Sequence, residues 1–239
     1  MSDDRRPKRF YTRAEAAAGE GGFRVELDGR PIRTPGRNLV AVPSRDTAEA
    51  LAAEWAAQGE RVDPMTMPLT RLVNSALDGV ARDPRAVADE IVRYAGSDLL
   101  CYRAEAPERL VDRQTLHWDP VLDWARDTLG ARFILTQGII FVDQPPSAVA
   151  AVDEALPADP LRLAALNLMT TLSGSALLAL AVWHGLLSPE AAWAAAHVDE
   201  DVQIEMWGED AEAMERRAAR WRDFSAAAAL LRQIGGPEG

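Results

Sequence analysis

The sequence lacks the glycine-rich loops that hold phosphate groups. Neither G-x-x-x-x-G-K-[ST] nor G-x-G-x-x-G occurs in its 239 residues, so no motif supports nucleotide binding. The nucleophile motif G-x-S-x-G is also missing. Cysteine is nearly absent, and the single Cys101 excludes an internal disulfide and is typical of a reducing compartment. These absences argue against a nucleotide-driven machine and a serine hydrolase.

The N-terminus lacks the apolar segment of a secretory signal, and Asp3 and Asp4 argue against an arginine-rich transit peptide. We therefore expect a mature cytosolic chain. One uncharged stretch, from Leu163 to Trp183, is long enough to cross a bilayer. Its middle is polar and small, with Asn167 and residues 170–175, and it lacks aromatic belts and flanking basic loops. We expect a buried helix there, or two helices broken near Gly174.

The composition indicates a folded, acidic protein. Hydrophobic residues make up 48% of the chain, which is enough for a sizeable core. The net charge is −11, from 26 basic and 37 acidic residues. Such a chain repels nucleic acid and anionic membranes, and it suits a basic partner.

The first part of the chain predicts β-structure with one helix. Alternating Phe23, Val25 and Leu27 precede Asp28-Gly29, the dipeptide that favours a type I′ hairpin turn. The stretch NLVAVP predicts a further strand. The stretch SRDTAEALAAEWAAQGE predicts a helix capped by Ser44 or Asp46, with an apolar stripe of Ala48, Leu51, Ala52 and Trp55.

The prolines of VDPMTMPLT indicate a boundary between a β-rich N-terminal domain, 1–66, and a helical C-terminal domain, 67–239. The fold class is α+β. Asp119-Pro120 predicts the start of a new helix, and Gln137-Gly138 a short β-like pair. Helices are expected near 68–80, 84–96, 107–129, 146–156, 160–187, 188–198 and 199–234.

Three sequence features could carry chemistry. Ser173 and Ser175 lie inside an apolar helix, where small residues usually allow close packing, and Cys101 between Leu100 and Tyr102 is typical of a buried small hydrophobe. His197, Asp201 and Glu205 fall at i, i+4 and i+8 of a helix and could hold a metal ion. A metal-dependent hydrolase using the acidic helix 197–210 is therefore an alternative function, and a solvated acidic face is the simpler interpretation.

The acidic stretch HVDEDVQIEMWGED also carries an aromatic residue. Glu200, Gln203 and Trp207 lie at i, i+3 and i+7, which places an acid, an amide and an indole on one helix face. Tryptophan is enriched at protein interfaces, so this face is a candidate docking site. The opposing interpretation, that Trp207 packs inward and the acids point outward, is equally open from the sequence.

Several segments, taken in order, resemble the assembly chaperones that handle the alpha subunit of F-type ATP synthase. They are LDGRPIRTP, EWAAQ with MPLTRL, YAGSDLLCYRA, PERLVDRQTLHWDPVLDW, LSGSALLALA and DEDVQIEMWG. They span about 27–208, nearly the whole chain. After Gly208 the sequence continues Glu209-Asp210-Ala211-Glu212, where mitochondrial members continue with a second tryptophan and a histidine, and this difference favours a bacterial member.

The resemblance implies a small β-rich N-terminal domain, a larger all-helical C-terminal domain and a binding function without catalysis. It implies an ATP-independent chaperone that binds the unassembled alpha subunit, prevents its aggregation and hands it to the beta subunit. The missing phosphate loop and the single histidine of the acidic stripe predict no nucleotide, no metal and no cofactor. The resemblance implies a location in the bacterial cytoplasm, or in the mitochondrial matrix of a eukaryote. A scaffold with an unrelated partner remains an alternative. The family's acidic motif falls on Asp199, Glu200, Gln203, Trp207 and Gly208.

Overall fold

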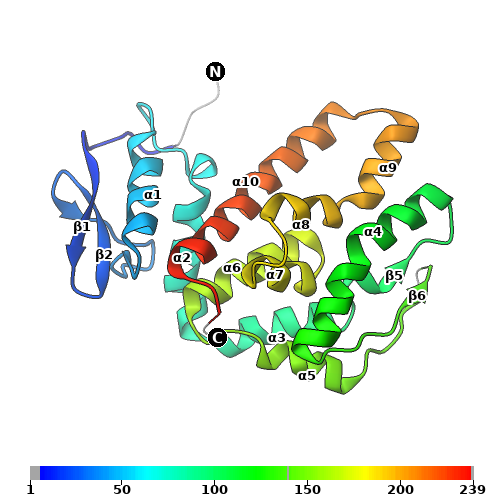
Figure 1. Ribbon diagram of the computed structural model, residues 1–239. Coiled ribbons are helices and arrows are strands. Elements are labelled where there is room, and N and C mark those ends of the chain that lie inside the picture. Colours follow the sequence, from blue (N-terminus) through cyan, green and yellow to red (C-terminus); the bar gives the residue numbers. More distant parts are fainter. Residues whose placement is uncertain (1–5, 139, 238–239) are drawn as a thin grey trace.

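The computed structural model describes residues 6–138 and 140–237. A small sheet with one covering helix forms one end of the molecule, and most of the rest is helical (Figure 1). This arrangement confirms the α+β class predicted from the sequence.

The N-terminal sheet is antiparallel and built around strand β2 (Gly22–Leu27). Strand β1 (Ala14–Gly19) pairs with one edge of β2, while β3 (Arg30–Pro31) and β4 (Ala41–Val42) pair with the other. Asp28 and Gly29 have φ angles of 49° and 76°, as the predicted hairpin turn requires. Strand β1 was not predicted from the sequence, because its AEAAAG sequence is alanine-rich and alanine favours helices.

Helix α1 (Arg45–Ala56) covers this sheet, and its N-cap is Ser44, whose hydroxyl accepts the Thr47 N–H. The predicted apolar stripe of α1 faces the core. The helical part comprises α2 (Pro68–Asp78), α3 (Pro84–Ala95), α4 (Glu108–Trp124), α5 (Pro146–Glu154), α6 (Pro160–Ser173), α7 (Ala176–Trp183), α8 (Pro189–Ala196), α9 (Val198–Trp207) and α10 (Ala211–Ile234).

Two predictions of helix boundaries in this part were wrong. No new helix begins at Asp119-Pro120, because α4 runs through Pro120. The carbonyl that Pro120 leaves unpaired belongs to Leu116, whose side chain is 69% exposed, so water can reach this face. The predicted helix 199–234 is two helices, α9 and α10, separated at Gly208.

The predicted β-like pair around Gln137-Gly138 is also different in the structure. Strand β6 (Thr136–Gln137) pairs in parallel with a distant strand, β5 (Tyr102–Arg103), and residue 139 lies outside the described residues. The expected all-helical part therefore contains this small sheet. Two strands so far apart in sequence give no local hairpin signal, so the pairing could not be found from turn chemistry.

Helices α6 and α7 form the centre of the helical part, and α2, α3 and α10 pack around α6. Helices α6 and α7 are separated at Gly174, which has a φ of 74°. This confirms the expectation of two helices broken near Gly174. Residues 176–181 are buried without exception. No helix within the described residues is long and apolar enough to cross a membrane.

Helix α2 is attached to the N-terminal part at both of its ends. The Glu54 carboxylate of α1 accepts hydrogen bonds from the N–H groups of Leu69 (2.8 Å) and Thr70 (2.7 Å), which are free donors at the start of α2. At the other end, Asp78 accepts the N–H of Gly36 at 2.7 Å. The two parts are therefore joined by hydrogen bonds across the predicted boundary between residues 66 and 67. The division into domains 1–66 and 67–239 stays a prediction.

Candidate docking surface

Helix α9 presents the predicted face to solvent. Val198 and Val202 point into the core, and the opposite side carries Glu200, Gln203 and Trp207, all exposed. The Trp207 side chain is 82% exposed, so the interpretation that it packs inward is wrong. Among the described residues, neither Glu200 nor Gln203 has a hydrogen-bond or ion-pair partner. We call Glu200, Gln203 and Trp207 the outer face of α9.

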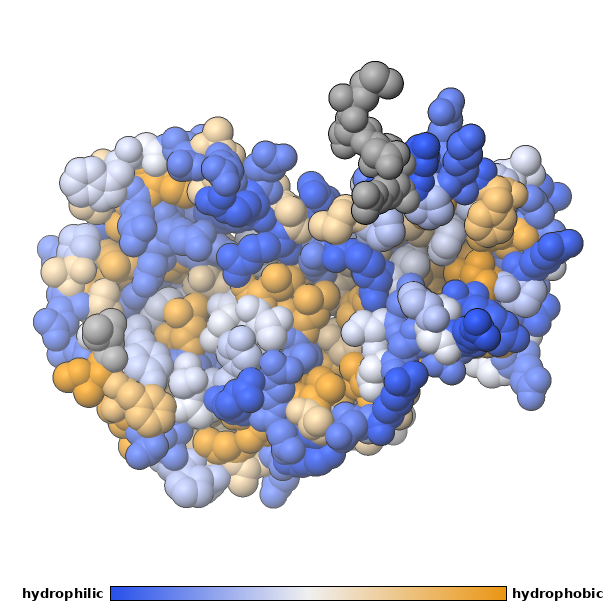
Figure 2. All heavy atoms as spheres, turned by 180° about the vertical axis from the view of Figure 1, so that it is seen from behind, coloured by the Kyte–Doolittle hydropathy of each residue, from blue (hydrophilic) through white to orange (hydrophobic). Residues whose placement is uncertain are grey.

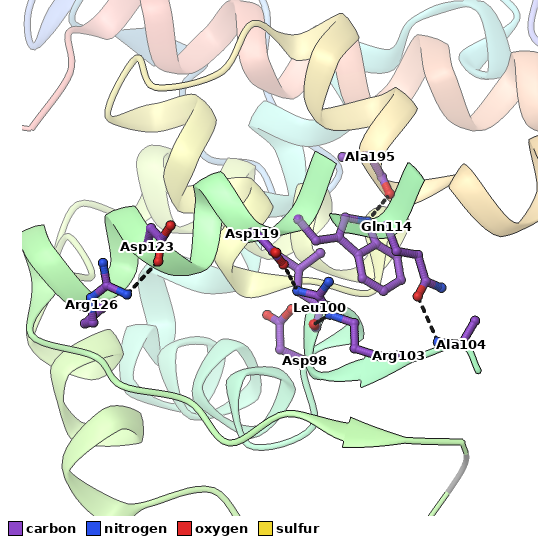
Figure 3. A network of polar contacts seen from close by, with 10 residues as sticks. Asp98, Leu100, Arg103, Ala104, Gln114, Asp119, Asp123, Arg126 and Ala195 are labelled. Atoms are coloured by element: carbon purple, nitrogen blue, oxygen red, sulfur yellow. Dashed lines mark hydrogen bonds and ion pairs between the residues drawn. The ribbon is translucent and has the colours of Figure 1, made fainter. Parts of the chain in front are cut away.

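Asp199 lies beside this face and is held in place by helix α4. The buried Gln114 donates its side-chain N–H to the Asp199 carboxylate at 2.8 Å and accepts the Ala104 N–H at 2.8 Å. Figure 3 shows Gln114 reaching from α4 toward Ala104. One turn on, the Trp118 indole donates to the Ala195 carbonyl at 2.8 Å. Both Gln114 and Trp118 are buried, so α4 holds the start of α9 through Asp199 and the end of α8 through Ala195.

Gly208 ends α9 and turns the chain toward α10. Its φ of 90° and ψ of 171° belong to a backbone region that only glycine adopts readily. Asp210 then caps α10 by accepting the Ala213 N–H at 2.8 Å. The role of Gly208 in the motif is therefore conformational, since it allows Trp207 to stand at the exposed corner between two helices.

The residues that could have held a metal are engaged elsewhere. The His197 Nδ1 contacts the Trp193 carbonyl at 2.8 Å, and burial lowers the pKa of this imidazole. Asp201 pairs with Arg217 of α10, and Glu205 pairs with Arg113 of α4 at 2.7 Å. Within the described part of the chain, no three His, Cys, Asp or Glu side chains converge as a metal site would require. The hydrolase alternative therefore has no supporting geometry.

The other candidate nucleophiles have structural roles. Ser173 donates its hydroxyl hydrogen to the Met169 carbonyl at 2.7 Å, and Ser175 caps α7 by accepting the Leu178 N–H at 3.0 Å. Cys101 is fully buried, and this burial raises the pKa of its thiol to about 12. A thiol with that pKa stays protonated at neutral pH, so it is a poor nucleophile.

An apolar groove lies between α8, α9 and α10, next to the acidic helix. Its volume is about 420 Å³, and its apolar lining includes Trp193, Met214, Ala218 and Trp221. Glu190 and the Asp201–Arg217 ion pair also line it. The sequence predicted helix in this region and did not predict a groove. Residues 214 and 218 lie before the buried part of α10, which begins at Phe224.

The chemistry of this region is recognition. An exposed indole, free carboxylate and amide groups and an adjacent apolar groove can bind a protein surface that carries basic and apolar side chains. The fold and this surface therefore have the properties expected of a protein-binding protein.

Comparison with known proteins identifies the family. The family model described as ATP12 chaperone protein matches residues 8–126. The structure is similar to that of Atp12 from Paracoccus denitrificans, at 40% sequence identity and a TM-score of 0.87, over 96% of this chain and 99% of that one. It is also similar to the Atu1473 protein of Agrobacterium tumefaciens, at 53% identity and a TM-score of 0.91, over 96% of this chain and 87% of that one.

A fission yeast relative, named protein atp12, mitochondrial, is 23% identical over 214 residues, which cover 84% of this chain and 74% of the relative. The chain belongs to the ATP12 chaperone family. This finding confirms the resemblance to ATP synthase assembly chaperones that the sequence motifs indicated. It also agrees with the expectation of a chaperone rather than an enzyme.

Proposed function

We propose that this protein is an ATP-independent assembly chaperone for the alpha subunit of F-type ATP synthase. It binds the unassembled subunit, prevents its aggregation and hands it to the beta subunit. Membership of the family supports this function, and the observation that carries the docking site is the 82% exposure of Trp207 beside the unpartnered Glu200.

The outer face of α9 is the proposed contact with the client. An exposed tryptophan is costly in water and is a common anchor in protein interfaces. Glu200 and Asp199 would meet basic side chains of the client, and Gln203 and Trp207 would follow along the same helix. Charges at the rim of an interface mainly set the encounter rate and the register, so binding would weaken with salt.

The likeness to proteins of Paracoccus and Agrobacterium supports a bacterial member of the family, and the proposed location is the bacterial cytoplasm. Handover requires no nucleotide cycle, because the beta subunit can displace the chaperone if both cover the same surface of the client.

The experiment is light scattering while the alpha subunit is diluted from denaturant, without ATP. We expect equimolar chaperone to suppress the scattering, and we expect the Trp207→Ala variant to do so poorly while melting within a few degrees of the wild type. Truncating an exposed side chain usually changes the free energy of unfolding by less than about 0.5 kcal/mol. Unchanged scattering with the wild-type protein, or suppression only when ATP is added, would contradict the proposal.

A further inference from the structure

A second cleft lies on the N-terminal part, at the end of the molecule away from α9 (Figure 1). Its volume is about 560 Å³. The walls come from the segment before β1, from the β2–β3 hairpin and from the end of α1, so three stretches distant in sequence build it. We call it the N-terminal cleft.

Aromatic side chains line one side of the N-terminal cleft. Phe10 is 78% exposed and packs edge-on against Tyr11, with ring centroids 5.4 Å apart. Tyr11 packs against Trp55 at 5.7 Å and donates its hydroxyl hydrogen to the Trp55 carbonyl at 2.7 Å. These contacts hold the aromatic wall in place before any ligand arrives. At the N-terminal end in Figure 2, on the right, hydrophobic side chains are framed by hydrophilic ones.

Two arginines also line this cleft, beside its apolar surface. Arg30 and Arg33 line the cleft and are exposed. Within the described residues Arg30 has no ion-pair or hydrogen-bond partner, and Arg33 donates only to the Arg37 carbonyl, at 2.9 Å. Most other arginines of this chain are paired with a carboxylate, including Arg24, Arg103 and Arg217. The cleft thus has two guanidinium groups that no carboxylate pairs with among the described residues.

The carboxylate that lines the N-terminal cleft does not neutralise both arginines. Asp28 accepts the backbone N–H groups of Arg13 at 2.8 Å and Thr12 at 3.1 Å, and also the Thr12 hydroxyl. These hydrogen bonds lower the pKa of Asp28, and the bond from the Arg13 N–H has the largest effect. The Asp28 carboxylate is thus directed toward the segment before β1. One carboxylate and two guanidinium groups line the cleft, so it retains positive charge although the whole chain carries −11.

From this geometry we propose that the N-terminal cleft docks an acidic segment of a partner protein. One bulky apolar side chain of this segment enters the aromatic pocket, and carboxylates on either side of it bind Arg30 and Arg33. Guanidinium groups bind carboxylates through paired hydrogen bonds, and an aromatic wall provides most of the contact area. A nucleic acid fits less well, because the −11 charge of the chain repels a polyanion. The cleft prefers an acidic segment and the outer face of α9 a basic one, so the two sites bind different segments. This inference does not rest on the identity of the proposed client.

The test uses a fluorescein-labelled ten-residue peptide with one phenylalanine between pairs of glutamates, followed by fluorescence anisotropy. We expect saturable binding to the wild-type protein. Binding should be about tenfold weaker with the double variant Arg30→Glu/Arg33→Glu, because like charges then face each other. The matched control is the double variant Arg222→Glu/Arg232→Glu on α10, which makes the same change in net charge at two exposed arginines that line no part of the cleft. It should change the affinity less than about twofold.

Further arms separate the apolar and ionic contributions. Replacing the peptide phenylalanine by alanine, or Phe10 by alanine in the protein, should each weaken binding about fivefold, since each removes one half of an aromatic contact. Melting curves confirm that the variants remain folded. Absence of saturable binding up to millimolar peptide, equal binding by the double variant, or equal binding of the alanine peptide would each overturn the proposal. Tighter binding of a single-stranded oligonucleotide than of the peptide would do so as well.

Discussion

Residues 1–66 and residues 67–239 differ in how they distribute charge. The first segment holds eleven basic and eleven acidic side chains, whereas the second holds 15 basic and 26 acidic ones. All of the net charge of −11 therefore belongs to the segment that contains the helical part. Among the described residues, the most exposed large aromatic side chain is Phe10 in the first segment, at 78%, and Trp207 in the second, at 82%. Phe10 lines a cleft with Arg30 and Arg33, and Trp207 shares a helix face with the Glu200 carboxylate.

This difference shows that an acidic protein need not present one uniform surface. Association is governed by the local charge around an apolar anchor, since exposed charges farther apart than about 8 Å are largely screened at physiological salt. The overall composition predicts a basic partner, and the local charge supports that prediction at one end of the molecule only. The other end has the properties of a site for an acidic segment.

The first prediction concerns the contact between Glu54 of α1 and the start of α2, which joins the N-terminal part to the helical part. Glu54→Ala removes the acceptor for the N–H groups of Leu69 and Thr70 and for the Thr70 hydroxyl. Leaving these donors unpaired should lower the free energy of unfolding by about 3 kcal/mol. Glu54→Gln retains one acceptor oxygen and should cost less. Denaturant unfolding measures both, and a loss below about 0.5 kcal/mol for the alanine variant would show that α2 does not need Glu54.

The second prediction concerns a carboxylate of the acidic part that lies in the core. Asp98 is fully buried and accepts the N–H groups of Leu100 and Leu177, each at 3.1 Å; Figure 3 shows it beneath α4. Burial raises its pKa from 3.8 to about 6. The folded state thus binds the proton more tightly than the unfolded state, and the stabilisation from this proton is complete below about pH 4 and is lost as the pH rises through 6.

An asparagine side chain cannot titrate, so the Asp98→Asn variant isolates this effect from the other carboxylates. Between pH 7 and pH 4.5 the wild type should gain about 2 kcal/mol of stability relative to the variant. Urea unfolding of both proteins at several pH values measures the difference. A constant difference over this range would mean that Asp98 does not change its protonation there.

The third prediction addresses the corner that exposes Trp207. Gly208→Ala places a side chain on a residue with a φ of 90°, and no atom lies within 4 Å of the added Cβ. The cost is therefore backbone strain alone, about 1 kcal/mol. The matched control is Gly59→Ala, where the Cβ also meets open space and φ is not in the left-handed region. Equal melting temperatures of the two variants would contradict a conformational role for Gly208.

Local sequence signals predicted the parts of the fold that depend on neighbouring residues. The Asp28-Gly29 turn, the Ser44 cap and the break at Gly174 follow from turn chemistry, capping and glycine conformation. Strand β1 was missed because pairing with β2 overrides the helical preference of alanine. The path of α4 through Pro120 depends on which face of α4 meets water, which local sequence does not give.

The candidate sites show the same division. The spacing of Glu200, Gln203 and Trp207 predicts that they share one helix face, and all three belong to the family motif. Only the tertiary structure shows that this face points outward. The N-terminal cleft joins residues 10, 30, 33 and 55. No spacing rule connects positions so distant, although the arginines of GRPIRTPGR, which gather around one hairpin without acidic neighbours after Asp28, were a signal in the sequence.

The central claim, that the outer face of α9 binds the client, is tested most directly by the affinity of Glu200→Lys for the alpha subunit. The control is Glu20→Lys, which makes the same change in net charge at an exposed glutamate of the β1–β2 turn. Both variants should melt within a few degrees of the wild type, because exposed substitutions usually shift stability by under about 0.5 kcal/mol. We predict at least about tenfold weaker binding for Glu200→Lys, a loss that shrinks as salt is raised, and less than about twofold change for Glu20→Lys. Equal affinity of the two variants would contradict the account.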